Sequence, residues 1–293
     1  MQTLSTALRN AIDAGNPQRV LLKFGNDEFS NEDIVLSGGV ELDEEYMSEE
    51  DLTIGLTPAS TLHFTMINDE GQLASFDFGW FSAYLGARID SGTPTEITRT
   101  FTENGQTVTY AFSKIGDFYA QKPDVIVKKQ ISIVAYDQML KLDVDMPSST
   151  TLGVTYPTTL SNIFDKICQY VGVTPESTTF LNSTLDVVME PEDFDMATVR
   201  QVIGWIAECA CSIARFNRDG KLEFAWFNTT SKSYDENNYT EFTPVRYETQ
   251  AINGLYYRNT DELKEDTQGT VKTNNYLIQD NPFLTDRTAE VSS

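Results

Sequence analysis

The chain holds a single histidine, His63, within the alternating segment TLHFTMIN. A zinc site with two or three imidazole ligands is therefore excluded, as is a zinc hydrolase with the HExxH spacing. A Ser/His/Asp or Cys/His nucleophilic site would have to use His63 itself. The alternation favours a histidine that packs on a strand, so we expect neither a catalytic residue nor a metal site.

Three cysteines, Cys168, Cys209 and Cys211, suit a reducing compartment better than a disulfide scaffold. Cys209 and Cys211 form a C-x-C pair rather than the CxxC of zinc and redox sites, and further ligands of the usual type are missing nearby. We therefore expect packing thiols. Neither GxGxxG nor GxxxxGK[ST] occurs, so no cofactor is expected.

Acidic residues dominate the charge: 44 Asp and Glu against 21 Lys and Arg give a net charge of −23. Such a chain repels nucleic-acid backbones, and we expect no stable nucleic-acid binding. No apolar run is long enough for a membrane segment. The densest acidic run comprises Glu41, Asp43, Glu44, Glu45, Glu49, Glu50 and Asp51. It lacks the central glycine of an EF-hand, which leaves a solvated loop or an acidic channel wall or interface.

The elements that would position these residues begin with an amphipathic helix in residues 1–16, where Leu4, Leu8 and Ala11 recur at helical spacing. Many short strands follow in residues 17–147, with Asn104-Gly105 as the strongest hairpin signal. Regularly spaced strands and turns of this kind predict a barrel-like antiparallel β-domain.

Residues 148–232 read as a small α+β domain with two helices and a hairpin. Thr158 or Thr159 opens the first helix and Gly172 ends it. Asp195 can cap the second helix, which carries an apolar face from Val199 onward. A hairpin turns at residues 217–220, and residues 233–293 hold strands of a second barrel domain, which the chain leaves incomplete. The fold class is therefore mainly β with α+β parts: antiparallel barrel-like β-domains plus a small α/β domain.

Four pieces, in order, carry a resemblance to a known family. They are YDQMLKLD at 136–143, YPTTLSNIFDKICQYVGV at 156–173, VRQVIGWIAECACSIARFNRDGKLEFAWF at 199–227, and NYLIQDNPFL at 275–284. Together they resemble the tail hub, or baseplate hub, proteins of phages, prophages and related contractile injection systems.

The resemblance implies a virion structural protein with no catalytic residues. Its members form a ring, typically a homotrimer, that joins the tail tube to the tip and lets DNA and the tape-measure protein pass. The implied partners are further copies of the chain, the tail tube or distal tail protein, the tape-measure protein, and tip, spike or baseplate proteins. The implied location is the virion tail, assembled in the bacterial cytoplasm.

Two other classes of function stay open. A carbohydrate-binding or carbohydrate-active β protein would expose Trp80, Trp205 or Trp226 beside a carboxylate pair, although the patterns around Trp205 and Trp226 favour core positions. A peptidase would depend on His63.

Overall fold

The computed structural model describes residues 4–35, 39–44, 54–69, 78–122, 129–225, 254–259, 262–265, 275–278 and 281–283, together with residues 71, 73 and 76. One large sheet, called here the large sheet, has the order β2-β1-β5-β7-β8-β4-β3, and β6 pairs with β7. Its strands are β1 (Gln18–Phe24), β2 (Asp27–Ser30), β3 (Glu41–Asp43), β4 (Thr61–Ile67), β5 (Trp80–Ile89), β6 (Ile97–Glu103), β7 (Gln106–Ala120) and β8 (Gln130–Asp137). All of their pairings are antiparallel, so the predicted fold class is confirmed.

The main apolar core of the large sheet joins side chains of β1, β4, β5, β7 and β8. Phe81 on β5 stacks on Phe24 of β1, with ring centroids 4.3 Å apart, and meets Phe64 of β4 edge to face at 5.7 Å. The chain leaving β2 also pairs with β4 through an isolated bridge between Ile34 and Met66. The end strands β2 and β3 do not pair within the described residues, so a closed barrel remains a prediction.

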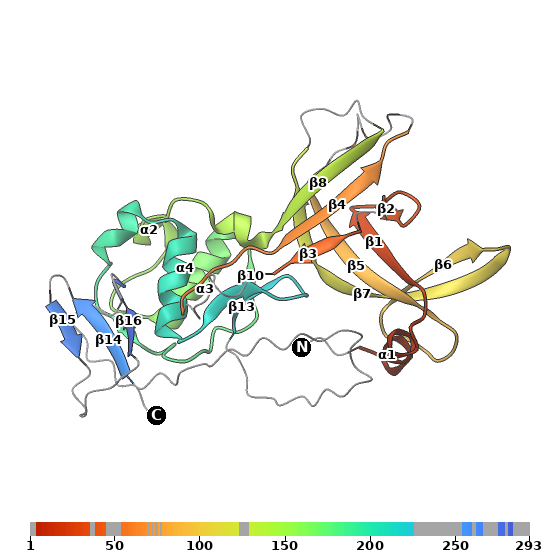
Figure 1. The fold of residues 1–293 in the computed structure, drawn as a ribbon. Helices are drawn as coiled ribbons and strands as arrows, with labels where there is room; N and C mark the ends of the chain where they lie inside the picture. Colours follow the sequence, from red (N-terminus) through yellow and green to blue (C-terminus); the bar gives the residue numbers. More distant parts are fainter. Residues whose placement is uncertain are drawn as a thin grey trace.

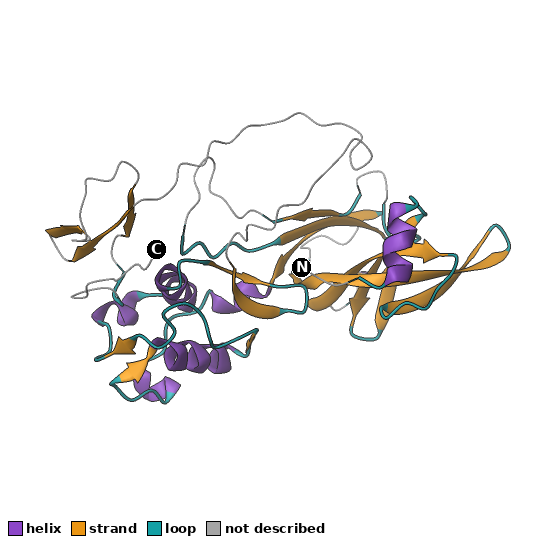
Figure 2. Ribbon diagram, turned by 90° about the horizontal axis from the view of Figure 1, so that it is seen from below, coloured by secondary structure: helices purple, strands orange, loops and turns teal. Residues whose placement is uncertain are grey.

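The N-terminal helix α1 (Thr6–Asp13) packs on β5 and β7, where Leu8 and Ala11 meet Ala87 and Ala111. The small alanine side chains let the helix approach the strands closely, and Figure 2 shows it lying across the sheet. The predicted hairpin at Asn104-Gly105 joins β6 to β7 and is confirmed. Figure 1 shows this hairpin extending away from the rest of the molecule.

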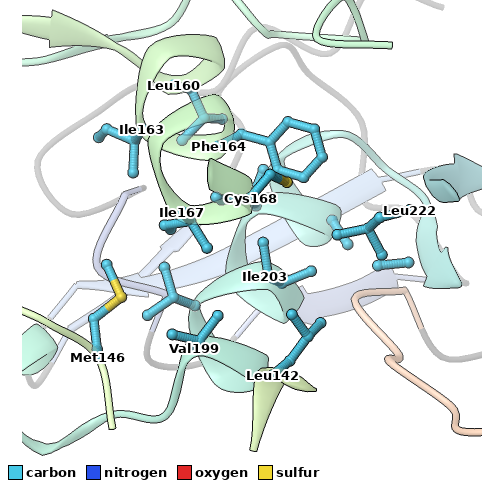
Figure 3. Packing of buried hydrophobic residues seen from close by; sticks show 14 of the residues in the cluster. Leu142, Met146, Leu160, Ile163, Phe164, Ile167, Cys168, Val199, Ile203 and Leu222 are labelled. Atoms are coloured by element: carbon cyan, nitrogen blue, oxygen red, sulfur yellow. The ribbon is translucent and has the colours of Figure 1, made fainter. Parts of the chain in front are cut away.

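A second unit follows β8, and we call residues 138–225 with 281–283 the small unit. Its elements are η2 (Gln138–Leu142), α2 (Ser149–Leu152), β9 (Thr158–Thr159), α3 (Leu160–Val171), β10 (Thr174–Pro175), β11 (Asp186–Val187), η3 (Glu192–Met196), α4 (Val199–Cys209), β12 (Ile213–Phe216) and β13 (Lys221–Ala225). Its core is formed where α3 faces α4 (Figure 3). Three further strands, β14 (Gly254–Asn259), β15 (Glu262–Glu265) and β16 (Asn275–Ile278), form a separate sheet.

The helix ends show why the sequence folds this way locally. Thr159 caps α3 and Gly172 ends it in a left-handed conformation, both as predicted. The predicted cap of α4 is wrong. The N-cap is Thr198, and its capping box with Gln201 satisfies backbone N–H groups that Asp195, inside η3, does not reach.

Residues 138–146 fall within the β-domain of residues 17–147 that the sequence predicts, but their buried side chains pack in the small unit. Met139, Leu142 and Met146 are buried in the core of the small unit, not in that of the large sheet. The side chain of Asp137 begins η2 by accepting a hydrogen bond from the Met139 amide. By packing, the chain passes from one unit to the other at Asp137.

We expect Thr198→Ala to lower the free energy of unfolding by about 1 kcal/mol, because the capping box is lost. Urea denaturation measures this change. Asp195→Ala is the matched control and should stay within about 0.5 kcal/mol of the parent chain, since Asp195 is exposed. A larger loss in the control than in Thr198→Ala would show that Asp195 is the effective cap.

Candidate functional site

The joint between the large sheet and the small unit is made by the tip of the β12–β13 hairpin. On β7, a β-bulge breaks the pairing with β5: Ala83 faces Gly116 and Tyr84 faces Lys114, so Ile115 has no opposite residue on β5. A bulge frees backbone groups from the ladder. The Ile115 carbonyl accepts a hydrogen bond from Nη1 of Arg218 at 2.7 Å, which ties the hairpin tip to the bulge.

Gly220 fits the same tip against a polar cluster. Asp117 accepts hydrogen bonds from the Ser82 hydroxyl at 2.6 Å and from the Lys114 ammonium at 2.7 Å. Gln138 Nε2 donates to the Gly220 carbonyl at 3.0 Å. A Cβ at Gly220 would lie 2.5 Å from Oδ2 of Asp117 and 2.6 Å from Nε2 of Gln138, so both polar groups would have to shift from this arrangement.

The segment that leads into β4 makes a second connection. The Gly55 amide donates to the Ser212 carbonyl, and the Ala214 amide donates to the Leu56 carbonyl, both at 2.9 Å. Nη2 of Arg200 on α4 donates to the Thr57 carbonyl at 2.7 Å. The backbone passes so close to α4 that a Cβ on Gly204 would lie 3.0 Å from the Gly55 carbonyl oxygen.

Residues 281–283 anchor in the small unit, far along the chain from their partners. The buried Asn281 side chain donates from Nδ2 to the Trp205 carbonyl at 2.9 Å and to the Glu208 carboxylate at 2.7 Å. Phe283 is buried and meets Phe194 edge to face, with ring centroids 5.7 Å apart. Residues 281–283, which entered the sequence analysis only as part of a resemblance, are thus an anchor of the core.

Glu208 is the unusual titratable group of this region. Burial raises the pKa of its carboxyl to about 7, and the hydrogen bond from Asn281 opposes part of that rise. Its methylene chain lies against Gly55, where a Cβ would come within 2.2 Å of Cγ. A partly protonated carboxyl at neutral pH therefore lies between α4, the segment at Gly55 and the anchor at Asn281.

The acidic run does not gather at one described place. Glu41 and Asp43 are exposed on β3, whereas Glu44 forms an ion pair with Arg218 at the joint. The predicted patch residues Glu45, Glu49, Glu50 and Asp51 lie outside the described residues. Their role as a channel wall or interface remains a prediction.

The candidate chemical residues are dispersed. His63 is exposed on β4, with its Nε2 3.3 Å from the Thr61 hydroxyl. Cys168 and Cys209 are buried, and burial raises the pKa of the Cys168 thiol to about 12. Among the described residues, no group of three or more His, Cys, Asp or Glu side chains is placed to hold a metal ion. No helix in the described parts is long and apolar enough to cross a membrane.

An exposed row of rings crosses the outer face of the large sheet, and we call Trp80, Tyr119 and Tyr136 the aromatic row. Trp80 pairs with Tyr119 across β5 and β7, and Tyr119 pairs with Tyr136 across β7 and β8. Their exposed fractions are 40%, 38% and 41%, while neighbours such as Phe81 and Phe118 point into the core. Of these three residues, the sequence analysis named only Trp80 as a possible sugar-binding side chain. The pairing of residues on different strands leaves no local signal in the sequence.

Beside the row lies an open depression of about 430 Å³. Its polar lining comes from Lys23, Ser82, Asp117, Gln138 and Lys141. The Lys141 ammonium lies 4.8 Å from the centroid of the Trp80 ring and donates to Oε1 of Gln138 at 2.8 Å. Of the other tryptophans, Trp205 packs partly buried against the core of the small unit, and Trp226 lies outside the described residues.

We expect Gly220→Ala to lower the free energy of unfolding more than Gly105→Ala does. Both glycines end hairpin turns with φ near +75°, so both variants pay a similar backbone cost. Only Gly220 faces Asp117 and Gln138, whereas nothing lies within 4 Å of a Cβ at Gly105. Overpacking adds about 1–3 kcal/mol at Gly220, measured by chemical denaturation. Equal losses in the two variants would contradict the joint.

We expect Glu208→Gln to change how stability depends on pH. The folded pKa of Glu208 is raised, so its favourable contribution is complete below the ordinary value of 4.5 and is lost as the pH rises towards about 7. The glutamine stays neutral and keeps an acceptor for Asn281. The variant should therefore gain up to about 3 kcal/mol over the parent chain between pH 4.5 and 8. A constant difference across this range would contradict the assignment.

No family model matches the chain, and no curated protein matches it. Among solved structures, the chain is similar to the 43 kDa tail protein of prophage MuSo2 from Shewanella oneidensis. That match has 12% identity, covers 91% of this chain and 73% of the other, and has a TM-score of 0.43. The tail protein from Neisseria meningitidis MC58 matches at 15% identity, covering 89% of this chain and 70% of the other, with a TM-score of 0.45. These structural neighbours are tail proteins, and the likeness does not place the chain in a family.

Proposed function

We propose that the chain is a structural, non-catalytic component of a phage or prophage tail, positioned in the baseplate hub. In this role it forms a homotrimeric ring that joins the tail tube to the tip and lets DNA and the tape-measure protein pass. It is assembled in the bacterial cytoplasm and resides in the virion tail.

The observation that carries this proposal is the convergence of the four resembling pieces. Each contributes a buried side chain to one apolar core: Met139, Phe164, Ile203 and Phe283. The pieces are spread over residues 136–284, yet buried residues from each of them meet in this one core. Sequence pieces that resemble a family and that build one core support a common fold. They do not imply a common catalytic activity.

The net negative charge of the chain supports a channel through which DNA passes without binding to the wall. Phosphate contacts with Lys and Arg provide the attraction that proteins offer to DNA irrespective of sequence. A net charge of −23 opposes such contacts at the wall of a channel.

The loops at residues 188–196 offer a surface for partners. Val188, Met189 and Met196 are 68%, 72% and 88% exposed, an unusual degree for large apolar side chains. Contiguous patches of exposed apolar side chains mark protein interaction sites, and we propose that these three residues contribute to one. The proposed partners are further copies of the chain, the tail tube or distal tail protein, the tape-measure protein, and tip, spike or baseplate proteins.

Light scattering tests the proposal with the purified chain, alone and with the tail tube protein from the same genome. We expect a mass about three times 32.9 kDa, either in isolation or once the tube protein is added. Electron micrographs of the same sample should show rings. A chain that stays strictly monomeric in both conditions would contradict the proposal.

A further inference from the structure

We infer that the aromatic row and the depression beside it form a binding site for an anionic oligosaccharide. This inference is separate from the proposed role in a tail, since it concerns exposed side chains of the large sheet and of η2 and not the shared apolar core that carries that proposal.

The geometry of the row suits a sugar chain. Strand spacing places the backbone positions of the first and third residues of the row about 10 Å apart, the length of a disaccharide. Trp80 and Tyr119 are in contact, with ring centroids 5.3 Å apart and planes inclined by 60°. Half-exposed rings on a rigid sheet present apolar faces to the C–H groups of pyranose rings, at little cost in side-chain entropy.

The depression supplies the hydrogen-bonding groups that sugars also need. Ser82, Asp117 and Gln138 line it with hydroxyl, carboxylate and amide groups directly beside Trp80. Ligand sites combine apolar walls with a few placed polar groups in this way. The centre of a protein–protein interface is instead depleted of charged residues, so the charged lining favours a glycan over a protein partner.

The lysines select for negative charge. Lys141 lies over Trp80, and no carboxylate among the described residues lies within ion-pair distance of its ammonium group. Lys23 also lines the depression, with its ammonium group 3.6 Å from the Glu28 carboxylate. In a chain with 44 acidic residues, a depression with two lysines is a local exception. Carboxylate groups on the sugar chain would pair with these ammonium groups.

Titration calorimetry with the full chain tests the inference, using tetragalacturonate as the probe and its neutral methyl ester as the matched ligand. We expect tetragalacturonate to bind and to bind more tightly than the ester. Trp80→Ala should weaken both ligands by about tenfold, since ring stacking is shared. Lys141→Gln should weaken only tetragalacturonate. Tyr170→Ala, a 50% exposed tyrosine on α3, is the control and should leave both affinities unchanged.

Circular dichroism of each variant checks folding, and Lys141→Gln keeps the test decisive if Trp80→Ala does not fold. Failure of the parent chain to bind either oligosaccharide at millimolar concentration would overturn the inference. Binding that Lys141→Gln leaves unchanged would also overturn it. A poly-glutamate peptide that binds more tightly than tetragalacturonate, and competes with it, would show instead that the surface takes an acidic protein segment.

Discussion

The hydrogen bond from Arg218 to the Ile115 carbonyl marks the contact on which the arrangement of the molecule depends. The bulge in β7 leaves that carbonyl without a partner in the ladder, and the hairpin tip supplies one. Arg218 also pairs with Glu44, so one side chain links the small unit to two regions of the large sheet. The gap lined by these residues is about 10 Å³, close to the least that holds one water molecule. The joint is therefore packed.

The two units have separate cores, and contacts besides the hairpin tip also join them. Asp137 ends β8 and starts η2, and its carboxylate also accepts from the Ser60 amide at 3.1 Å. The segment at Gly55 and the anchor at Asn281 add contacts on the other side of α4, with Glu208 between them. The depression that we infer to bind a glycan is lined by both units, because Gln138 and Lys141 belong to the small unit and Trp80 to the large sheet. Its shape depends on the joint.

Local features of the fold could be predicted from the sequence because short-range chemistry determines them. The hairpins at Asn104-Gly105 and residues 217–220, the cap of α3 at Thr159 and its left-handed end at Gly172 need only a few neighbouring residues. The cap of α4 was predicted wrongly because two nearby residues, Asp195 and Thr198, both have capping side chains. The reciprocal bond with Gln201 decides between them.

Long-range contacts could not be predicted from the same patterns. Glu44 and Arg218 are 174 residues apart, and Asn281 and Trp205 are 76 apart, with no periodicity that connects them. The bulge at Ile115 lies within the continuous strand β7, and only the register with β5 reveals it. The aromatic row likewise exists only across three strands. For the chemistry-bearing residues, the expectation of a buried packing thiol is confirmed for Cys209, whereas Cys211 is only partly buried. The channel role of the acidic run remains a prediction.

Native-state hydrogen exchange tests the joint most directly. If the hairpin tip and the bulge hold the two units together, the amides of β7 around residues 114–118 and those of β12 and β13 should open with the same free energy. Both should lose protection together in Arg218→Ala. Exchange of β12 and β13 at a lower free energy than β7, with protection at the bulge unchanged in Arg218→Ala, would contradict the claim that this contact unites the fold.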